Sequence, residues 1–188
     1  MTLFQNVRNG LIPARLTVDE VYALQEAGVL SERDHWELIE GEIVPMAAAK
    51  ANWHSMMEGR LIEGLVSGLP SDCRLHPAPS IALATDTLVE PDLAVLPKGR
   101  LPRDLRGPDL LLVIEVSDSS LAYDLRVKSL LYARHGVREY WVVDAVRQTI
   151  RVHRAPGEGV YTDIEEYEAH DRVSALLLPI TIVLGELD

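Results

Sequence analysis

Two acidic side chains occur inside apolar stretches of the sequence, where a carboxylate is costly. Asp92 lies in LVEPDLAVLP, residues 88–97, and Glu115 lies in LLLVIEVSDSS, residues 110–120. A buried carboxylate is destabilising unless a cation or hydrogen-bond donors compensate it. If the two stretches form neighbouring strands, the carboxylates lie side by side, and Mg²⁺ binds such a pair while it keeps several water ligands. The two residues therefore predict a metal site.

Two pairs of polar residues at helical spacing are candidates to join these carboxylates. Asp124 and Lys128 are four residues apart in a predicted helix and share one of its faces. His54 and Glu58 have the same spacing on the apolar stripe of an earlier predicted helix. Polar side chains on such a stripe are either hydrogen-bonded core residues or members of a site. We expect Lys128 to reach the end of the sheet that carries Glu115, and both interpretations stay open for His54 and Glu58.

The first elements that would position these residues are predicted from capping and periodicity. LTVDEVYALQEAGVL predicts a helix over residues 17–27, which begins with Thr17 and Glu20 at capping-box spacing and ends at Gly28. HWELIEGEIVPM predicts two short strands around a Glu40–Gly41 turn. NWHSMMEGRLIEGLVSGL has apolar residues at helical spacing and predicts the helix that carries His54.

The rest of the chain predicts strands around one long helix. RLHPAPSIALA, DLAVL, DLLLVIEVS, REYWVVDA and TIRVHRAP are typical of strands, and SSLAYDLRVKSLLYARHGV predicts a helix that ends near Gly136. LLLPITIVL, near the C-terminus, is either an edge strand or a seam between subunits. Helices packed on a mixed central sheet give an α/β (α+β) fold. A length of 188 residues with 47% hydrophobic residues suits a single domain over residues 1–188.

Composition also restricts the compartment of the protein. No apolar run reaches the ~20 residues of a membrane-spanning helix. The N-terminal MTLFQNVRNGLIPARL has neither the apolar core nor the cleavage site of a signal peptide. The single cysteine, Cys73, excludes an intramolecular disulfide. We therefore expect a cytoplasmic protein that does not enter membranes.

The charge of the chain argues against nonspecific coating of nucleic acid. Eighteen basic and 29 acidic residues give a net charge of −11, which repels phosphate at long range. PKGRLPRDLR nevertheless contains several cations, and Lys98 and Arg100 are our candidate substrate-binding residues. A solvated loop is the simpler interpretation of this segment.

Two blocks of the sequence carry a resemblance to a known family. EPDLAV, followed by LLVIEVSDSSLAYDLRVKSLLYARHGVREYWVVD, resembles the Uma-two family, a branch of the PD-(D/E)XK nuclease superfamily whose members are expected to be restriction endonucleases. The resemblance places the Pro-Asp of the superfamily motif on Pro91-Asp92 and the Glu-x-Lys on Glu115-Val116-Ser117, so that a serine replaces the lysine. In this branch the lysine comes from the next helix, which implies Lys128. The implied fold is a restriction-endonuclease-like mixed central sheet flanked by helices.

The activity that the resemblance implies is metal-dependent hydrolysis of phosphodiester bonds in DNA. Asp92, Glu115 and the carbonyl of Val116 would bind Mg²⁺ or Mn²⁺, which polarises the phosphate and activates a water molecule. Lys128 would orient that water or offset charge on the phosphate. Asp124 would hold Lys128 in place.

The resemblance also implies site roles for Glu42 and His54. We expect a homodimer, because two strands of DNA require two active sites. Two other functions stay open. A non-catalytic binding or assembly module with the nuclease fold is favoured by the net charge and the displaced lysine. An acidic surface is also compatible with a hydrolase of a small phosphorylated molecule.

Overall fold

The computed structural model describes residues 15–30, 35–46 and 52–187, which fall into two compact units. The smaller unit contains the described part of residues 1–48 and residues 82–89, and the larger unit contains the described part of residues 49–81 and 90–188. Residues 1–14, to which most of the signal-peptide prediction applies, lie outside the described ranges. The single domain over residues 1–188 stays a prediction. Among the described helices, none has the length and apolar character needed to span a membrane.

The smaller unit is a helix packed on a four-stranded sheet with the strand order β2-β1-β5-β4. Its elements are α2 (Val18–Glu26), β1 (Trp36–Ile39), β2 (Glu42–Pro45), β4 (Ile81–Ala84, whose first residue belongs to the larger unit) and β5 (Thr87–Val89). Thr17 and Glu20 form the predicted capping box, in which the Thr17 N–H donates to the Glu20 carboxylate at 2.8 Å. The predicted helix over residues 17–27 and the two strands around Glu40–Gly41 are confirmed.

The larger unit contains a six-stranded mixed sheet with the order β10-β9-β8-β7-β6-β3, in which only the β7–β8 pair is parallel. The strands are β3 (Cys73–Pro77), β6 (Leu93–Pro97), β7 (Leu112–Ser117), β8 (Glu139–Asp144), β9 (Thr149–Gly157) and β10 (Val160–Tyr167). A separate two-stranded sheet is formed by β11 (Arg172–Ser174) and β12 (Thr181–Val183). The helical segments are α3 (Asn52–Val66), η1 (Pro102–Asp104), η2 (Gly107–Asp109), α4 (Leu121–Tyr123), η3 (Asp124–Lys128), α5 (Ser129–Arg134) and η4 (Leu184–Glu186).

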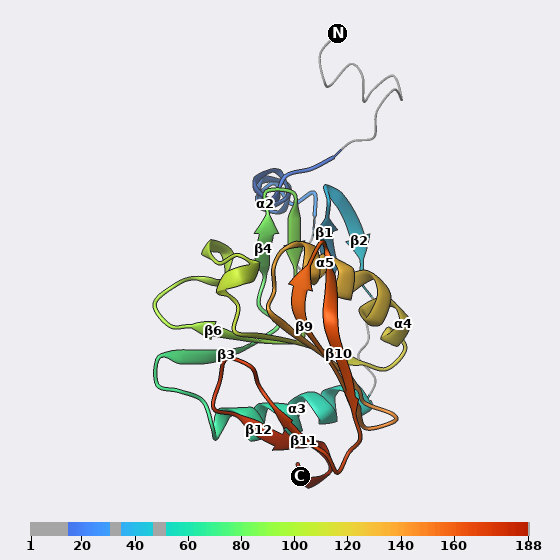
Figure 1. Cartoon of the computed structure of the whole chain (residues 1–188). Helices are drawn as coiled ribbons and strands as arrows, with labels where there is room; N and C mark the ends of the chain where they lie inside the picture. The colour runs from blue at the N-terminus through green and yellow to red at the C-terminus, as the bar shows by residue number, and fades with distance from the viewer. Residues whose placement is uncertain (1–14, 31–34, 47–51, 188) are drawn as a thin grey trace. The chain divides into compact units, whose positions relative to one another are not determined.

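The two faces of the six-stranded sheet are covered by different helices. Met57 and Leu61 of α3 pack against Ile114 and Val116 of β7, and β11 and β12 complete the same core. Figure 1 shows α3, β11 and β12 on one side of this sheet and α4 and α5 on the other. Because neighbouring side chains of a strand point to opposite faces, Glu115 points to the side of α4 and α5. The predicted mixed sheet flanked by helices is therefore confirmed in this unit.

The predicted continuous helix after β7 is interrupted. Residues Asp124–Lys128 form a π turn between α4 and α5, in which the Ser129 N–H donates to the Asp124 carbonyl five residues earlier. Apolar periodicity indicates that a segment is helical and not which hydrogen-bond pattern it adopts, so this difference was not predictable from it. The segment ends as predicted, just before Gly136, which has a φ of 75°.

Two other elements differ from the expectation. RLHPAPSIALA is two strands, β3 and β4, because the chain turns at Ala78, where φ is 42°. In LLLPITIVL, β12 pairs with β11 and is not an edge strand of the larger sheet. Ile180 and Ile182 of this segment are buried in the core of the larger unit, which removes them from a seam between subunits.

Candidate metal centre

The antiparallel pairing of β6 and β7 brings the two predicted carboxylates together. Leu93 is opposite Ile114 in this pair, so Asp92, one residue earlier, is adjacent to Glu115, one residue later. The Asp92 N–H lies 3.4 Å from Glu115 Oε2, and Asp92 Oδ2 accepts a hydrogen bond of 2.8 Å from the Val116 N–H. The expected side-by-side placement is therefore confirmed, although 23 residues separate Asp92 from Glu115 along the chain.

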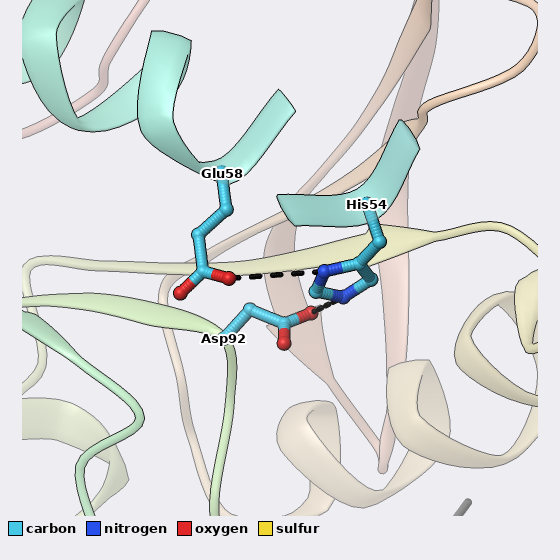
Figure 2. Close-up of side chains that lie close together, drawn as sticks. All are labelled: His54, Glu58 and Asp92. Atoms are coloured by element: carbon cyan, nitrogen blue, oxygen red, sulfur yellow. Dashed lines mark hydrogen bonds and ion pairs between the residues drawn. The ribbon is translucent and has the colours of Figure 1, made fainter. Parts of the chain in front are cut away.

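Helix α3 adds an imidazole and a third carboxylate to this end of the sheet. His54 Nε2 lies 3.1 Å from Asp92 Oδ2, and His54 Nδ1 lies 3.7 Å from Glu58 Oε2. Figure 2 shows the imidazole between the two carboxylates, with His54 and Glu58 on successive turns of the helix. One ligand atom from each of the three residues lies within 4.8 Å of the other two. Three potential metal ligands therefore converge on one point.

The donor set of this cluster fits a divalent cation. His54 is 9% exposed, and its Nδ1 is buried without a hydrogen-bond partner in the described ranges. A buried polar atom without a partner is destabilising, and metal ligation is one way to satisfy it. Carboxylate oxygens suit Mg²⁺ and Mn²⁺, and an imidazole nitrogen favours transition-metal ions. The cluster can therefore bind a cation through Asp92 together with His54 and Glu58.

Glu115 is held from the opposite face of the sheet. Lys128 Nζ donates to Glu115 Oε1 at 2.9 Å, and the Tyr132 hydroxyl donates to the same oxygen at 3.0 Å. The Lys128 and Glu115 side chains are only 5% and 7% exposed, and Tyr132 is fully buried. Lys128 therefore reaches the predicted carboxylate, and the two donors on Oε1 direct Glu115 Oε2 toward Asp92.

The π turn that carries Lys128 is stabilised by side-chain hydroxyls. The Tyr140 hydroxyl donates to the Asp124 carbonyl at 3.2 Å, and the Ser129 hydroxyl donates to the Leu125 carbonyl at 2.7 Å. Burial raises the pKa of the Tyr140 hydroxyl well above its ordinary value, and the negative charge of Glu115 adds to this rise. Tyr140 is thus a neutral donor that fixes the backbone of the turn.

Asp124 lies in the same turn, next to Ser117, the residue that replaces the lysine of the motif. Its Oδ2 accepts hydrogen bonds from Ser117 at 2.7 Å and from Ser120 at 2.6 Å. Burial raises the pKa of the Asp124 carboxyl, and these hydrogen bonds and the charge of Lys128 oppose part of the rise. Asp124 therefore links the end of β7 to the turn, and its positioning of Lys128 stays a prediction.

Three predicted site residues have their contacts elsewhere. Glu42, in β2 of the smaller unit, forms an ion pair of 3.3 Å with Arg15. Lys98 donates to the Ser71 carbonyl at 2.8 Å. Because Asp92 precedes β6 and Lys98 follows it, the two residues are roughly 20 Å apart at ~3.3 Å per residue. The roles of Glu42 and Lys98 stay predictions.

Arg100, the second predicted substrate-binding residue, is tied to its own loop. It forms an ion pair of 2.8 Å with Asp109 and donates to the Asp104 carbonyl at 2.7 Å. The Asp109 carboxyl also accepts from the Arg106 N–H, and this hydrogen bond and the one from Arg100 lower its pKa. A guanidinium with these partners would have to exchange them for a phosphate, and its substrate role stays a prediction.

Of two further neighbours of the candidate site, the sequence leaves Glu58 open between a core and a site role, and Tyr132 was not among the predicted members. Glu58 shares the helical stripe of His54, and this spacing is the signal that identifies it in the sequence. Tyr132 follows Lys128 by four residues, and the same spacing places both on the face toward Glu115. An aromatic residue at this position is more often a core residue. Only the hydrogen bond of the Tyr132 hydroxyl to Glu115 distinguishes a site role from a packing role.

The comparisons with known proteins give a family and a similar fold. The profile of the Uma2 family, described as "Putative restriction endonuclease", matches residues 18–185. The crystal structure of a "putative nuclease belonging to DUF820" from Anabaena variabilis is similar in fold, with a TM-score of 0.69 over 92% of this chain and 97% of that chain and 18% sequence identity. No curated protein matches the chain. Because the family profile extends over most of the sequence, the chain belongs to the Uma2 family.

Proposed function

We propose that this chain is a divalent-metal-dependent nuclease that hydrolyses phosphodiester bonds of DNA. The observation that carries the proposal is the position of Asp92, which contacts His54 of α3 and the Val116 N–H of β7 through one oxygen atom. Asp92 thereby joins the His54–Glu58 pair to the strand that carries Glu115 and its lysine partner. Membership of a family described as "Putative restriction endonuclease" supports the same activity.

Asp92 would be the central ligand of a bound Mg²⁺ or Mn²⁺. Glu115 and the Val116 carbonyl are the further ligands that the motif predicts, and His54 and Glu58 are those that the cluster favours. When bound, such an ion polarises a phosphoryl oxygen and lowers the pKa of a coordinated water molecule.

The other side chains would orient the reacting groups. Lys128, held against Glu115, would orient the attacking water or offset negative charge that develops on the phosphate. Tyr132 and Lys128 together hold one oxygen of Glu115, which directs the second oxygen toward Asp92 and the cation. Asp124 would keep the π turn in register with β7.

Calorimetric titration with Mn²⁺, combined with a cleavage assay, tests the proposal. The wild type, Asp92→Asn and Glu115→Gln are titrated, and the same samples are incubated with supercoiled plasmid and with circular single-stranded DNA. Asp163→Asn is the matched control, because Asp163 is an exposed carboxylate on β10. We expect Mn²⁺ binding and metal-dependent cleavage in the wild type and the control, and loss of both in the two site variants.

The other outcomes separate the alternatives. Metal binding without cleavage of either DNA would contradict the nuclease activity and move the search to small phosphoesters. Absence of Mn²⁺ and Mg²⁺ binding in the wild type would contradict the metal centre and favour a binding or assembly module. The predicted homodimer and cytoplasmic location stay predictions, and analytical ultracentrifugation of the purified chain checks the first.

A further inference from the structure

Helix α3 exposes two large apolar side chains beside the candidate metal centre. Trp53 is 60% exposed and Met56 is 57% exposed, whereas His54 and Met57 of the same turn are buried. An exposed tryptophan is uncommon, since its ring contributes more to stability when buried than almost any other side chain. The other two tryptophans are less accessible, with Trp36 half-buried and Trp141 fully buried.

Trp53 and Met56 lie on the helix that carries His54 and Glu58. Trp53 directly precedes His54, so their Cα atoms are about 3.8 Å apart. Residues three apart on a helix share a side, and Trp53 and Met56 therefore form one apolar surface. Figure 2 shows the first turns of α3 beside Asp92, where His54 contacts it. Trp53 is therefore one residue away from a side chain that contacts Asp92.

The charge of the chain limits how nucleic acid can gain affinity for it. A net charge of −11 makes phosphate neutralisation a poor source of affinity for nucleic acid. Lys98 and Arg100, the predicted phosphate-binding residues, are already engaged by Ser71 and Asp109. Stacking of a nucleobase on an aromatic ring supplies affinity without basic residues, and every base has a face that can stack.

We infer that Trp53, supported by Met56, stacks an unpaired nucleobase of the strand whose phosphate is held at Asp92. The substrate is then a strand with unpaired bases beside the scissile bond, because bases inside a duplex have no free face to stack on Trp53. This inference rests on the proposed nuclease function and specifies its substrate class. Trp53 is a substrate-positioning residue in this arrangement and takes no part in the chemical step.

Binding measurements on short oligonucleotides test the inference without relying on cleavage. Fluorescence anisotropy, with Ca²⁺ present in place of Mg²⁺ to occupy the oxygen ligands, compares labelled (dT)₁₂, an abasic strand of the same length and a duplex of the same length. The proteins are the wild type, Trp53→Ala, Trp53→Phe and Val146→Ala, in which the control removes a side chain that is 63% exposed in the turn after β8. We expect Trp53→Ala to weaken (dT)₁₂ binding roughly 5- to 100-fold, since stacking contributes about 1–3 kcal/mol per base. Trp53→Phe should retain most of the affinity.

The abasic strand identifies the contact, because it keeps the phosphates and removes the bases. The wild type should bind the abasic strand and the duplex only as weakly as Trp53→Ala binds (dT)₁₂. Trp53→Ala should bind the abasic strand and the duplex with the same affinity as the wild type does. An equal loss on the abasic strand, or no loss on (dT)₁₂, would overturn the inference. Self-association of the wild type that Trp53→Ala abolishes would overturn it as well, since a second copy would then cover this surface.

Failure of this inference is distinguishable from failure of the proposed function. Metal-dependent cleavage that proceeds equally on duplex and single-stranded circles, and equally in Trp53→Ala, would leave the nuclease standing and overturn the stacking role. Trp53-dependent binding of (dT)₁₂ by a chain that cleaves no DNA would support the stacking role and contradict the nuclease activity.

Discussion

Two carboxylates in the larger unit, the fully buried Glu139 and the half-buried Asp92, differ in what surrounds them. Glu139 accepts hydrogen bonds from the Arg154 guanidinium at 2.9 and 2.7 Å, from the Trp141 indole at 3.0 Å and from the Leu176 N–H at 2.6 Å. Asp92 instead has a ligand atom of a second carboxylate, Glu58, within 4.8 Å and an imidazole at 3.1 Å. An arginine thus compensates the first acid, whereas acids gather around the second.

This difference shows that burial of an acid does not by itself mark a functional site. Glu139 is fully buried and starts an apolar strand, in the way that Asp92 precedes one. A guanidinium neutralises Glu139 and fixes the strand, so that the acid is structural. The acids near Asp92 repel one another, and a cation between them lowers that repulsion. The charge of the neighbours therefore separates a structural acid from a candidate ligand.

The largest expected effect comes from removing the charge of Glu139 and of Asp92 in two separate variants and comparing their stability and metal binding. Glu139→Ala should lower the free energy of unfolding by about 3–5 kcal/mol, because it leaves Arg154 without its buried partner. Asp92→Asn should change that free energy by less than about 1 kcal/mol and abolish Mn²⁺ binding. Urea unfolding and calorimetry on both variants measure the two effects, and the reverse pattern would contradict the comparison.

Low pH should lower the stability of the fold through a buried imidazole, that of His153. Its contribution must be measured separately from those of Glu139 and Asp92. Burial lowers the pKa of His153 to about 4 from its ordinary value of 6.5. The unfolded chain therefore binds a proton at a higher pH than the folded chain, and stability falls as the pH drops from about 6.5 to about 4.

The expected loss from His153 is on the order of 3 kcal/mol across that range. Urea unfolding at several pH values measures it. His153→Gln should lack this part of the pH dependence, and His170→Gln should keep it, because the His170 side chain is 85% exposed. An unchanged slope in His153→Gln would contradict the assignment.

A smaller effect is expected for the hydroxyl that holds Glu115. Tyr132→Phe removes one of two donors on Glu115 Oε1 and should lower the free energy of unfolding by about 1–2 kcal/mol. It should also weaken Mn²⁺ binding, because the carboxylate is less well oriented. Tyr161→Phe is the matched control, since the buried Tyr161 hydroxyl donates to the Val137 carbonyl at 2.8 Å. Equal Mn²⁺ affinities in the two variants would show that Tyr132 does not act through the metal centre.

The smallest effect is expected at the π turn. Tyr140→Phe removes the hydroxyl that donates to the Asp124 carbonyl and should cost about 1 kcal/mol. Amide hydrogen exchange should accelerate at Ser129, whose N–H donates to the same carbonyl. Exchange at Ile150, in the neighbouring strand β9, serves as the internal reference, and equal acceleration at both amides would indicate a global loss of stability.

Periodicity and strand pairing were sufficient to predict much of the larger unit. Asp92 and Glu115 could be selected because each is an ionisable residue in an apolar context, and antiparallel pairing of their strands brings them together. Lys128 was implied mostly by the family resemblance. The capping box at Thr17 was predictable because its signal is local. These predictions rest on short-range rules that tertiary contacts did not override.

Other parts of the site depend on contacts that no local pattern contains. Tyr132 has the spacing of a core residue, and only its hydroxyl on Glu115 shows a second role. Glu139 has the sequence context of a candidate ligand, and Arg154 is fifteen residues away from it. The loop cations could be predicted as free, but acceptors from the same loop and from Ser71 engage them. Whether an ionisable side chain is structural or a candidate site residue therefore depends on long-range charge pairs, which composition does not show.

Because of the π turn between α4 and α5, the number of residues in this segment matters as much as their types for the positions of Asp124 and Lys128. Each residue advances an α-helix by about 100°, so the turn sets the part before it and the part after it in different rotational phases. Deletion of Val127 would let the segment close into a regular helix and rotate Asp124 away from Ser117 while Lys128 stays opposite Glu115. Substitutions there can be repaired by a neighbouring side chain, whereas a change in residue number cannot. Variation among related chains should therefore include exchanges of residues within this turn but neither insertions nor deletions.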